Sequence, residues 1–208
     1  MSRAATLERG YTDGARKVAS RSMLGLARTR VTPNALTTGG VTLCAVASVL
    51  VFYEDRNEIL FFWLGAAIFG VGSILDVLDG ALARASGKGT PFGAFLDSTT
   101  DRVSEGFMLG AIALVFARHG EMVAVALAFA AVAASFLVSY TRARAEALGL
   151  KGDVGIGSRA ERVVVIFAGL VLAPWGVLPW AIGLLAVTAW FTVGQRILSV
   201  RAQLRSLD

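Results

Sequence analysis

Four aspartates form the pattern in this chain with the clearest chemical meaning. Asp76 and Asp79 lie three positions apart, and Asp97 and Asp101 lie four positions apart, within otherwise apolar sequence. In a helix of ~3.6 residues per turn, each of these steps places both carboxylates on one face. Two such helices side by side would gather four anions, which must be protonated or neutralised by cations. Since hard oxygen ligands favour magnesium, manganese or calcium, the sequence predicts a divalent metal site at these four aspartates.

A simpler interpretation places the acids at solvated helix ends near a membrane surface. The first acidic pair alone would allow this. The second pair, however, continues through Arg102 and Glu105 into an apolar stretch. Ionisable groups within a membrane are costly and are usually retained for function, so we favour a functional site.

The composition predicts an all-α integral membrane protein. The chain has 208 residues, of which 55% are hydrophobic and 17% are charged. We expect a single domain with six transmembrane helices, each of about 20 residues, at residues 35–53, 59–75, 91–117, 122–140, 159–173 and 177–194. The third and fifth helices reach full length only by including charged residues, whose side chains must face protein, metal or water. Glycines between Gly80 and Pro91 are expected to break the chain into a turn.

The distribution of basic residues predicts the orientation in the membrane. Lysine and arginine gather on one side of the expected spans: seven before residue 33, two at 80–90, five at 142–162 and three after 194. The opposite side holds only Arg56 and Arg118. Both termini and the acids are therefore expected on the cytoplasmic side of the cell membrane. The net charge of +5 indicates attraction to a membrane surface, and no nucleic-acid partner is expected.

The first 32 residues are basic and lack the apolar core of a signal peptide. We expect them to form an amphipathic helix on the cytoplasmic membrane surface, followed by the transmembrane bundle at residues 33–208. The alternative is a disordered basic tail. The single cysteine, Cys44, is expected to be a packing residue.

The acidic run also carries small and basic residues at fixed positions. It reads Asp76-x2-Asp79-Gly80-x2-Ala83-Arg84-x8-Gly93-x3-Asp97-x3-Asp101. All eight specified positions resemble the signature of the CDP-alcohol phosphotransferase family. The resemblance implies a six-helix membrane enzyme, usually a homodimer, that uses Mg²⁺ or Mn²⁺. Such an enzyme transfers a phosphatidyl-type group from a CDP-diacylglycerol-type lipid to an alcohol and releases CMP.

The resemblance also implies roles for individual residues. Asp76, Asp79 and Asp97 would be metal ligands, and Asp101 would be both a ligand and the general base that removes the acceptor hydroxyl proton. The remaining matched positions would bind the CDP-lipid: Gly80, Ala83, Arg84 and Gly93, together with Asn34 and Thr37 at the start of the first span. For Arg84, the alternative is a counter-ion at a helix end.

A second polar segment bears on the acceptor. It contains five residues that could hold an anion: Ser139, Arg142, Arg144, Arg159 and Arg162. Guanidinium groups bind phosphate oxygens in pairs, which suggests an acceptor that carries its own phosphate. Arg142 and Arg144 would point about 200° apart on a helix, so only one of them is expected to face the site. The alternative is that these arginines only reflect the cytoplasmic excess of basic residues.

This segment is similar to the acceptor region of the phosphatidylinositol phosphate synthases and of their archaeal ether-lipid counterparts. The resemblance implies inositol phosphate as acceptor and phosphatidylinositol phosphate as product. Two departures are Arg142, where lysine is common, and Ala160, where proline is common.

Other functions are less consistent with the residues. Glycerol 3-phosphate is the nearest rival acceptor, but its synthases typically carry proline and lysine where Ser98 and Arg102 stand here. Serine or choline-like acceptors lack a phosphate for the arginines to bind. A cation transporter would place acids on both access routes near the bilayer centre, whereas these acids cluster toward one side.

Overall fold

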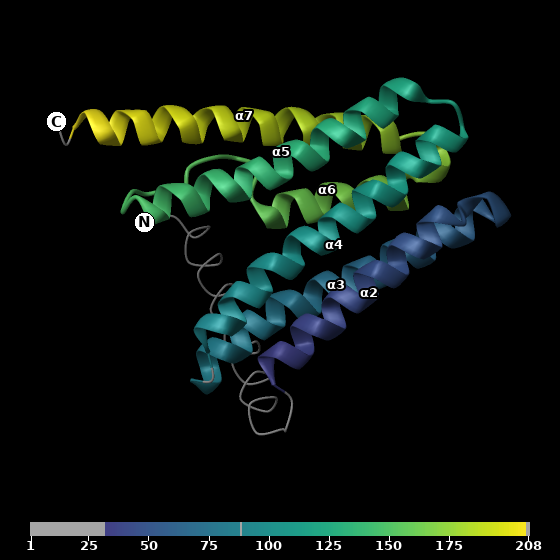
Figure 1. Cartoon of the computed structure of the whole chain (residues 1–208). Coiled ribbons are helices and arrows are strands. Elements are labelled where there is room, and N and C mark those ends of the chain that lie inside the picture. The colour runs from purple at the N-terminus through teal and green to yellow at the C-terminus, as the bar shows by residue number, and fades with distance from the viewer. Residues whose placement is uncertain (1–31, 88, 207–208) are drawn as a thin grey trace, which may run out of the picture.

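The computed structural model describes residues 32–87 and 89–206. Within these residues the chain is helical and contains no strand, as the sequence predicts (Figure 1). The helices, in chain order, are α2 (Pro33–Phe52), the 3₁₀ turn η1 (Glu54–Arg56), α3 (Glu58–Ser86), α4 (Pro91–Arg118), α5 (Met122–Ala147), α6 (Arg159–Val171), the 3₁₀ turn η2 (Ala173–Trp175) and α7 (Leu178–Arg205).

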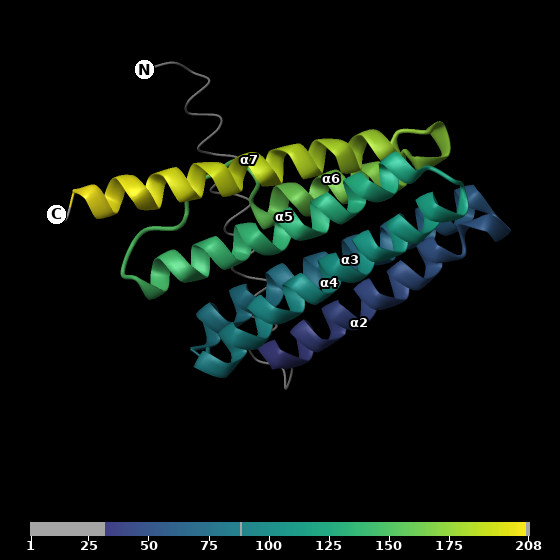
Figure 2. The same cartoon turned by 45° about the horizontal axis from the view of Figure 1, so that its top comes forward.

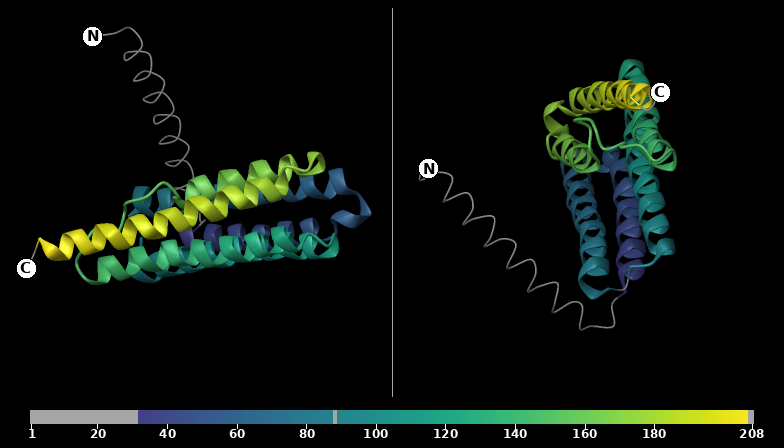
Figure 3. Two further views of the ribbon diagram at one scale, coloured as in Figure 1. Left: turned by 90° about the horizontal axis from the view of Figure 1, so that it is seen from above. Right: turned by 90° about the vertical axis from the view of Figure 1, so that its left-hand side faces the viewer.

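The long helices form two groups that share one core. Helices α2, α3 and α4 pack together, α5 and α6 pack on α7, and the groups meet where α4 contacts α5 and α3 contacts α6. The turns from α2 to α3, α4 to α5 and α6 to α7 lie at one end of the bundle (Figures 1 and 2). The α3–α4 turn and the α5–α6 loop lie at the other end, with the end of α7. The two groups diverge toward that second end (Figure 1), which faces the viewer in the right-hand view of Figure 3.

Local sequence signals explain where the helices around the site begin. Thr32 and Thr90 precede prolines, and each threonine hydroxyl accepts a hydrogen bond from a backbone N–H three residues later, at 3.2 and 3.0 Å. Proline suits the first turn of a helix because its missing N–H has no partner there. Helices α2 and α4 therefore begin at fixed points beside the acidic run.

Helix α3 is longer than the sequence predicts. We expected the break to start at Gly80, yet the helix continues to Ser86 and ends at Gly87, whose φ of 65° is left-handed. A single glycine within a helix costs only about 1 kcal/mol, so tertiary contacts override it. As a result Asp76, Asp79 and Arg84 all lie on one continuous helix.

The expectation of six full-length spans is met only in part. Four helices of the described residues are long and apolar enough to cross a membrane: α2, Glu58–Arg84 of α3, α5 and α7. Helix α6 has 13 residues, which gives a length of about 20 Å. Helix α4 contains the charged residues of the site, which lower its hydropathy. The predicted surface helix before residue 33 lies outside the described residues, so the division of the chain at that point stays a prediction.

Candidate active site

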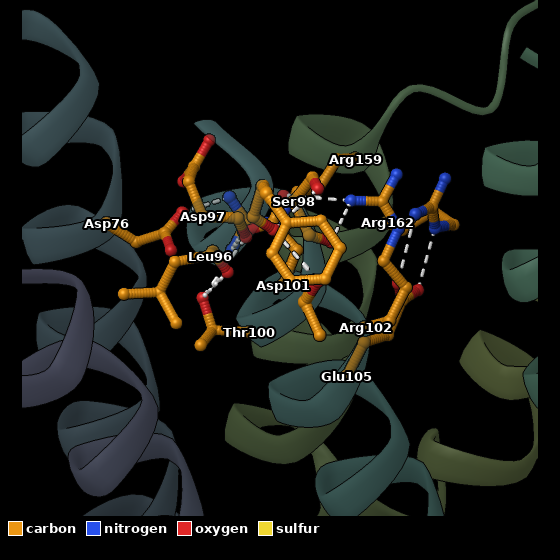
Figure 4. A network of polar contacts seen from close by, with 12 residues as sticks. Asp76, Leu96, Asp97, Ser98, Thr100, Asp101, Arg102, Glu105, Arg159 and Arg162 are labelled. Carbon is orange, nitrogen blue, oxygen red and sulfur yellow. Dashed lines mark hydrogen bonds and ion pairs between the residues drawn. The ribbon is translucent and has the colours of Figure 1, made fainter. Parts of the chain in front are cut away.

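Three of the four aspartates form a compact cluster. Asp76 lies on α3, and Asp97 and Asp101 lie one helical turn apart on α4. One carboxylate oxygen from each lies within 4.8 Å of the others (Figure 4). The step of four residues places Asp97 and Asp101 on one face of α4, and this face meets Asp76 because α3 and α4 both pack on α2.

Asp79 lies apart from this cluster. Its Oδ2 accepts a hydrogen bond from the hydroxyl of Thr37 on α2. Its Oδ1 is buried and has no hydrogen-bond partner in the described part of the chain. Asp79 is 2% exposed, so this unpartnered oxygen is an unfavourable arrangement unless a ligand completes it.

The residues fit a divalent metal centre. Carboxylate oxygens are the ligands that Mg²⁺ and Mn²⁺ prefer. Three anionic groups within 4.8 Å repel one another strongly unless a cation lies between them. The buried oxygen of Asp79 is a further available ligand. Asp76, Asp79, Asp97 and Asp101 are the residues that would hold such ions.

Arg159 neutralises part of this charge. Its Nη1 donates to Asp76 Oδ2, and its Nη2 lies 2.8 Å from Asp101 Oδ1. Arg159 is the first residue of α6, and Ser158 caps that helix in a reciprocal capping box with Glu161. From the sequence we expected Arg159 to bind the acceptor phosphate; in this structure its guanidinium joins two of the acids.

A pocket of about 180 Å³ opens on one side of the acids. It lies among α2, α3 and the start of α4. Its lining includes every residue that the sequence analysis assigned to the CDP-lipid: Asn34, Thr37, Gly80, Ala83, Arg84 and Gly93. Asp79 and Asp97 also line it. We call it the nucleotide-side pocket.

Gly93 illustrates why small residues occur in this pocket. A Cβ atom on Gly93 would lie 3.1 Å from Asn34 Oδ1 and 3.2 Å from Thr90 Oγ1. Such distances are shorter than ordinary contacts, so a side chain here would press on the α2–α4 junction. The glycine lets the two helices meet closely beside the acids.

A larger cleft of about 880 Å³ opens on the other side, among α4, α5 and α6. Asp97 and Asp101 line it, as do Arg102, the residue after Asp101, and Glu105, one turn further along α4. Ser139, Arg142, Arg159 and Arg162 contribute from α5 and α6. We call it the acceptor-side cleft. Asp97 and Ala94 line both openings, so the acids lie between them.

Comparison with known proteins agrees with this arrangement. The family model for CDP-alcohol phosphatidyltransferase matches residues 30–197, most of the chain and all of the site. The chain belongs to this family. It is an enzyme of the phosphatidyltransferase class, as the eight-residue signature predicts.

Individual relatives of this CDP-alcohol phosphatidyltransferase point to a narrower group. Phosphatidylinositol phosphate synthase of Mycobacterium marinum is 38% identical over 85% of this chain and 76% of its own length. Archaetidylinositol phosphate synthase of Pyrococcus horikoshii is 38% identical over 86% and 88%.

Solved structures give the same result. Phosphatidylinositol phosphate synthase of Mycobacterium tuberculosis with CDP-DAG bound superposes with a TM-score of 0.78 at 31% identity, over 88% of this chain and 94% of that chain. Its complex with manganese and citrate gives 0.78 at 33% identity, over 88% of each chain. A manganese complex in a relative and the acidic cluster here both indicate dependence on a divalent metal.

Arg162 of this phosphatidyltransferase is engaged by protein groups. It is 4% exposed, and its Nε and Nη2 donate to the two carboxylate oxygens of Glu105 at 2.7 and 3.0 Å. Its Nη1 donates to the Gly157 carbonyl at 2.8 Å. The paired ions link α6 to α4 at the floor of the acceptor-side cleft (Figure 4).

The two arginines of α5 have different positions. Arg142 lines the acceptor-side cleft, and its Nε donates to Glu146 Oε1 at 2.9 Å. Arg144 is exposed and is not among the residues that line that cleft. This is the outcome expected for two side chains about 200° apart on one helix.

From the sequence we assigned no site role to several cleft residues. Arg102 and Glu105, which we noted only as a continuation of the polar face, line the cleft from α4, and Glu146, Phe136 and Tyr140 line it from α5. Glu105 follows Asp101 by another step of four residues, which is the signal that places it on the same face. Nothing in the local sequence marks Phe136 or Tyr140, because an aromatic residue in an apolar helix usually faces lipid or core.

Proposed function

We propose that this enzyme transfers a phosphatidyl-type group from a CDP-linked lipid to inositol phosphate, releasing CMP and forming phosphatidylinositol phosphate. The observation that carries the proposal is the position of the acids between two openings. The nucleotide-side pocket has small residues and one arginine, whereas the acceptor-side cleft carries several arginines. A donor and a phosphorylated acceptor could thus reach the acids from opposite sides.

The reaction assigns different tasks to the acids. A hydroxyl oxygen of inositol phosphate attacks the lipid-side phosphorus of the pyrophosphate, and the bond from that phosphorus to the CMP oxygen breaks. Asp101 lines the acceptor-side cleft, and we assign it to accept the hydroxyl proton. A bound Mg²⁺ or Mn²⁺ would supply positive charge that neutralises the pyrophosphate and the leaving CMP. Asp79 and Asp97 line the nucleotide-side pocket, so their carboxylates lie on the side of the site where the CDP-lipid would bind.

The arginines support a phosphorylated acceptor. Arg142 and Arg159 are 55% and 30% exposed in their side chains, so both can reach a ligand in the cleft. Arg159 already joins two acids, and among the described residues Arg142 pairs only with the exposed Glu146, a contact that contributes little to stability. Ser139 offers a hydroxyl beside them. Arg162 lies at the buried floor of the cleft, and its positive charge would attract the phosphate from there.

The relatives support inositol phosphate in particular. One is a phosphatidylinositol phosphate synthase and the other an archaetidylinositol phosphate synthase. The inositol phosphate head group is common to the products named for both enzymes, whereas the lipid part differs. The relatives therefore support the acceptor of the present enzyme and not the chemistry of its lipid tails.

The enzyme is a multi-pass membrane protein. We propose that α4 and α6 complete a six-helix crossing with the four apolar helices, with their charged ends turned to the site. Both termini and the two openings would lie on the cytoplasmic side, where the basic residues gather. Assembly as a homodimer stays a prediction from the family.

A turnover assay tests the proposal. Purified enzyme with Mg²⁺ and CDP-diacylglycerol is offered inositol 1-phosphate, free inositol, glycerol 3-phosphate and serine separately, and CMP release is followed. We expect release only with inositol 1-phosphate. Release with glycerol 3-phosphate instead would still show transfer from a CDP-lipid, but it would refute inositol phosphate as the acceptor.

A further inference from the structure

A residue of α7 that lines neither opening is hydrogen-bonded to the α5–α6 loop, which directly precedes the site arginines of α6. Thr192 is fully buried, and its hydroxyl accepts a hydrogen bond from the Gly157 N–H at 2.9 Å. We propose that Thr192 is a positioning residue of the acceptor-side cleft, which sets α6 and its arginines against the acids. The predicted effect on the KM for inositol phosphate rests on the proposed function, whereas the predicted effect on the order of the α5–α6 loop does not.

Gly157 is held from both sides. Its N–H is bound by Thr192, and its carbonyl accepts from Arg162 Nη1 at 2.8 Å. The next residue, Ser158, caps α6, and Arg159 follows it. A shift of Gly157 therefore displaces both arginines, one that contacts Asp76 and Asp101 and one that contacts Glu105.

The approach of the loop to α7 depends on glycine. A Cβ on Gly155 would lie 2.3 Å from Thr192 Cγ2, and a Cβ on Gly157 would lie 2.8 Å from Thr192 Oγ1. Gly155 also has a φ of 130°, which other residues rarely adopt. The glycines of this loop thus allow its backbone to lie directly on Thr192.

Two more residues of α7 bind the same loop. Gln203 makes a reciprocal pair with the Lys151 backbone: its Oε1 accepts from the N–H and its Nε2 donates to the carbonyl, both at 2.9 Å. Arg196 Nε donates to the Val154 carbonyl at 2.9 Å. Bonds to residues 151, 154 and 157 hold the loop along its length against one face of α7.

The attachment of the α5–α6 loop to α7 affects residues of the acceptor-side cleft and none of the nucleotide-side pocket. The residues that line the nucleotide-side pocket all fall between Pro33 and Asp97, on α2, α3, the α3–α4 turn and the start of α4. The acceptor-side cleft is lined partly by α5 and α6, which the loop joins. Loosening the loop should therefore affect the acceptor and leave the CDP-lipid nearly unaffected.

A matched pair of variants tests the proposal. Thr192→Val keeps the shape but leaves the buried Gly157 N–H without a partner, whereas Thr192→Ser keeps the hydroxyl. We expect Thr192→Val to raise the KM for inositol 1-phosphate about tenfold, the effect of one unpaired buried N–H. The KM for CDP-diacylglycerol should change by less than about twofold. Equal behaviour of the two variants, or equal rises in both KM values, would overturn the proposal.

Amide hydrogen exchange provides a readout that needs no turnover. In Thr192→Val, exchange of the peptide that covers residues 149–158 should be faster, and in Thr192→Ser it should match the wild type. Unchanged exchange in Thr192→Val refutes the positioning role. Failure of the wild type to use inositol phosphate would instead refute the proposed function, and the exchange comparison would still be decisive.

A second variant covers the case in which Thr192→Val does not fold. Gln203→Met removes both bonds to Lys151 at a partly exposed position, and Arg201→Met on the same helix is its control. Gln203→Met should speed exchange of the loop and raise the acceptor KM, whereas Arg201→Met should do neither. Identical results for the two variants would contradict an attachment through α7.

Discussion

At the scale of residues, the four aspartates have distinct surroundings. Asp79 is bound by Thr37 and faces the nucleotide-side pocket, whereas Asp101 faces the acceptor-side cleft beside Arg159. Asp97 lines both. One motif thus places carboxylates at both openings, and substitutions within it should have different kinetic effects.

The Asp101 carboxylate is predicted to be needed for turnover and not for donor binding. Asp101→Asn keeps the shape of the side chain but is a far weaker base, so kcat should fall by at least about 10²-fold. Binding of CDP-diacylglycerol, measured by calorimetry in detergent, should persist because Asp101 does not line that pocket. Asp153→Asn in the exposed α5–α6 loop is the control. Turnover near the wild-type rate would exclude Asp101 as the base.

The buried pair of Arg162 and Glu105 is predicted to serve both stability and acceptor binding. Arg162→Ala leaves Glu105 buried without its cation, which costs about 3–5 kcal/mol, so the melting temperature should fall. The KM for inositol phosphate should rise far more than that for CDP-diacylglycerol.

The double variant Arg162→Ala/Glu105→Ala separates these two effects. Stability should partly return, because no unpaired carboxylate remains, while the acceptor KM should stay high. If the acceptor KM recovered together with stability, Arg162 would have only a structural role.

At the scale of elements, close packing of α2 on α3 sets the donor side of the site. A Cβ on Gly72 of α3 would lie 2.9 Å from the Gly40 carbonyl of α2 and 2.9 Å from Cys44 Sγ. Helix α2 also carries Thr37, which binds Asp79. The distance between these helices therefore controls whether Thr37 reaches the acid.

Gly72→Ala is accordingly predicted to impair the donor side. The added methyl group should push α2 away, destabilise the protein by about 1–3 kcal/mol and raise the KM for CDP-diacylglycerol more than that for the acceptor. Gly110→Ala in α4 is the control, because among the described residues no atom beyond the neighbouring backbone of α4 lies within 4 Å of its Cβ position. Thermal unfolding and two-substrate kinetics would test both variants, and equal effects would show that helix spacing is unimportant here.

The elements also show what the sequence could and could not predict. The step of four residues correctly predicted that Asp97 and Asp101 share a face of α4, whereas Asp79, three residues after Asp76 on α3, lies apart from the cluster. The end of α3 was predicted too early, at Gly80, because tertiary packing outweighs the low helix propensity of one glycine. The attachment of Gly157 to Thr192 joins residues 35 positions apart, and no periodicity in a single sequence reports such a contact.

At the scale of the whole molecule, the bundle separates two kinds of polar cluster. At the end opposite the site, Glu54 is buried and pairs with Arg118 at 3.1 Å and His119 at 3.2 Å. This cluster joins the α2–α3 corner to the α4–α5 corner. The helices are thus fixed at that end, while they diverge at the end that holds the two openings (Figure 1).

The excess of basic residues at the open end predicts that this end faces the cytoplasm. In a Cys44→Ala background, Glu121→Cys places a thiol in the α4–α5 turn and Asp153→Cys places one in the α5–α6 loop. A membrane-impermeant maleimide on intact cells should label the Glu121→Cys protein only, and permeabilised cells should allow labelling of both. The reverse pattern would invert the proposed orientation.

A competition experiment tests whether the enzyme joins a CDP-lipid to inositol phosphate at these acids. Wild-type enzyme with Mg²⁺ and CDP-diacylglycerol receives inositol 1-phosphate, glycerol 3-phosphate and free inositol together at equal concentrations. The lipid products are then identified by mass spectrometry. We predict phosphatidylinositol phosphate as the dominant product, absent in Asp101→Asn. Dominant phosphatidylglycerophosphate or unphosphorylated phosphatidylinositol would contradict the account.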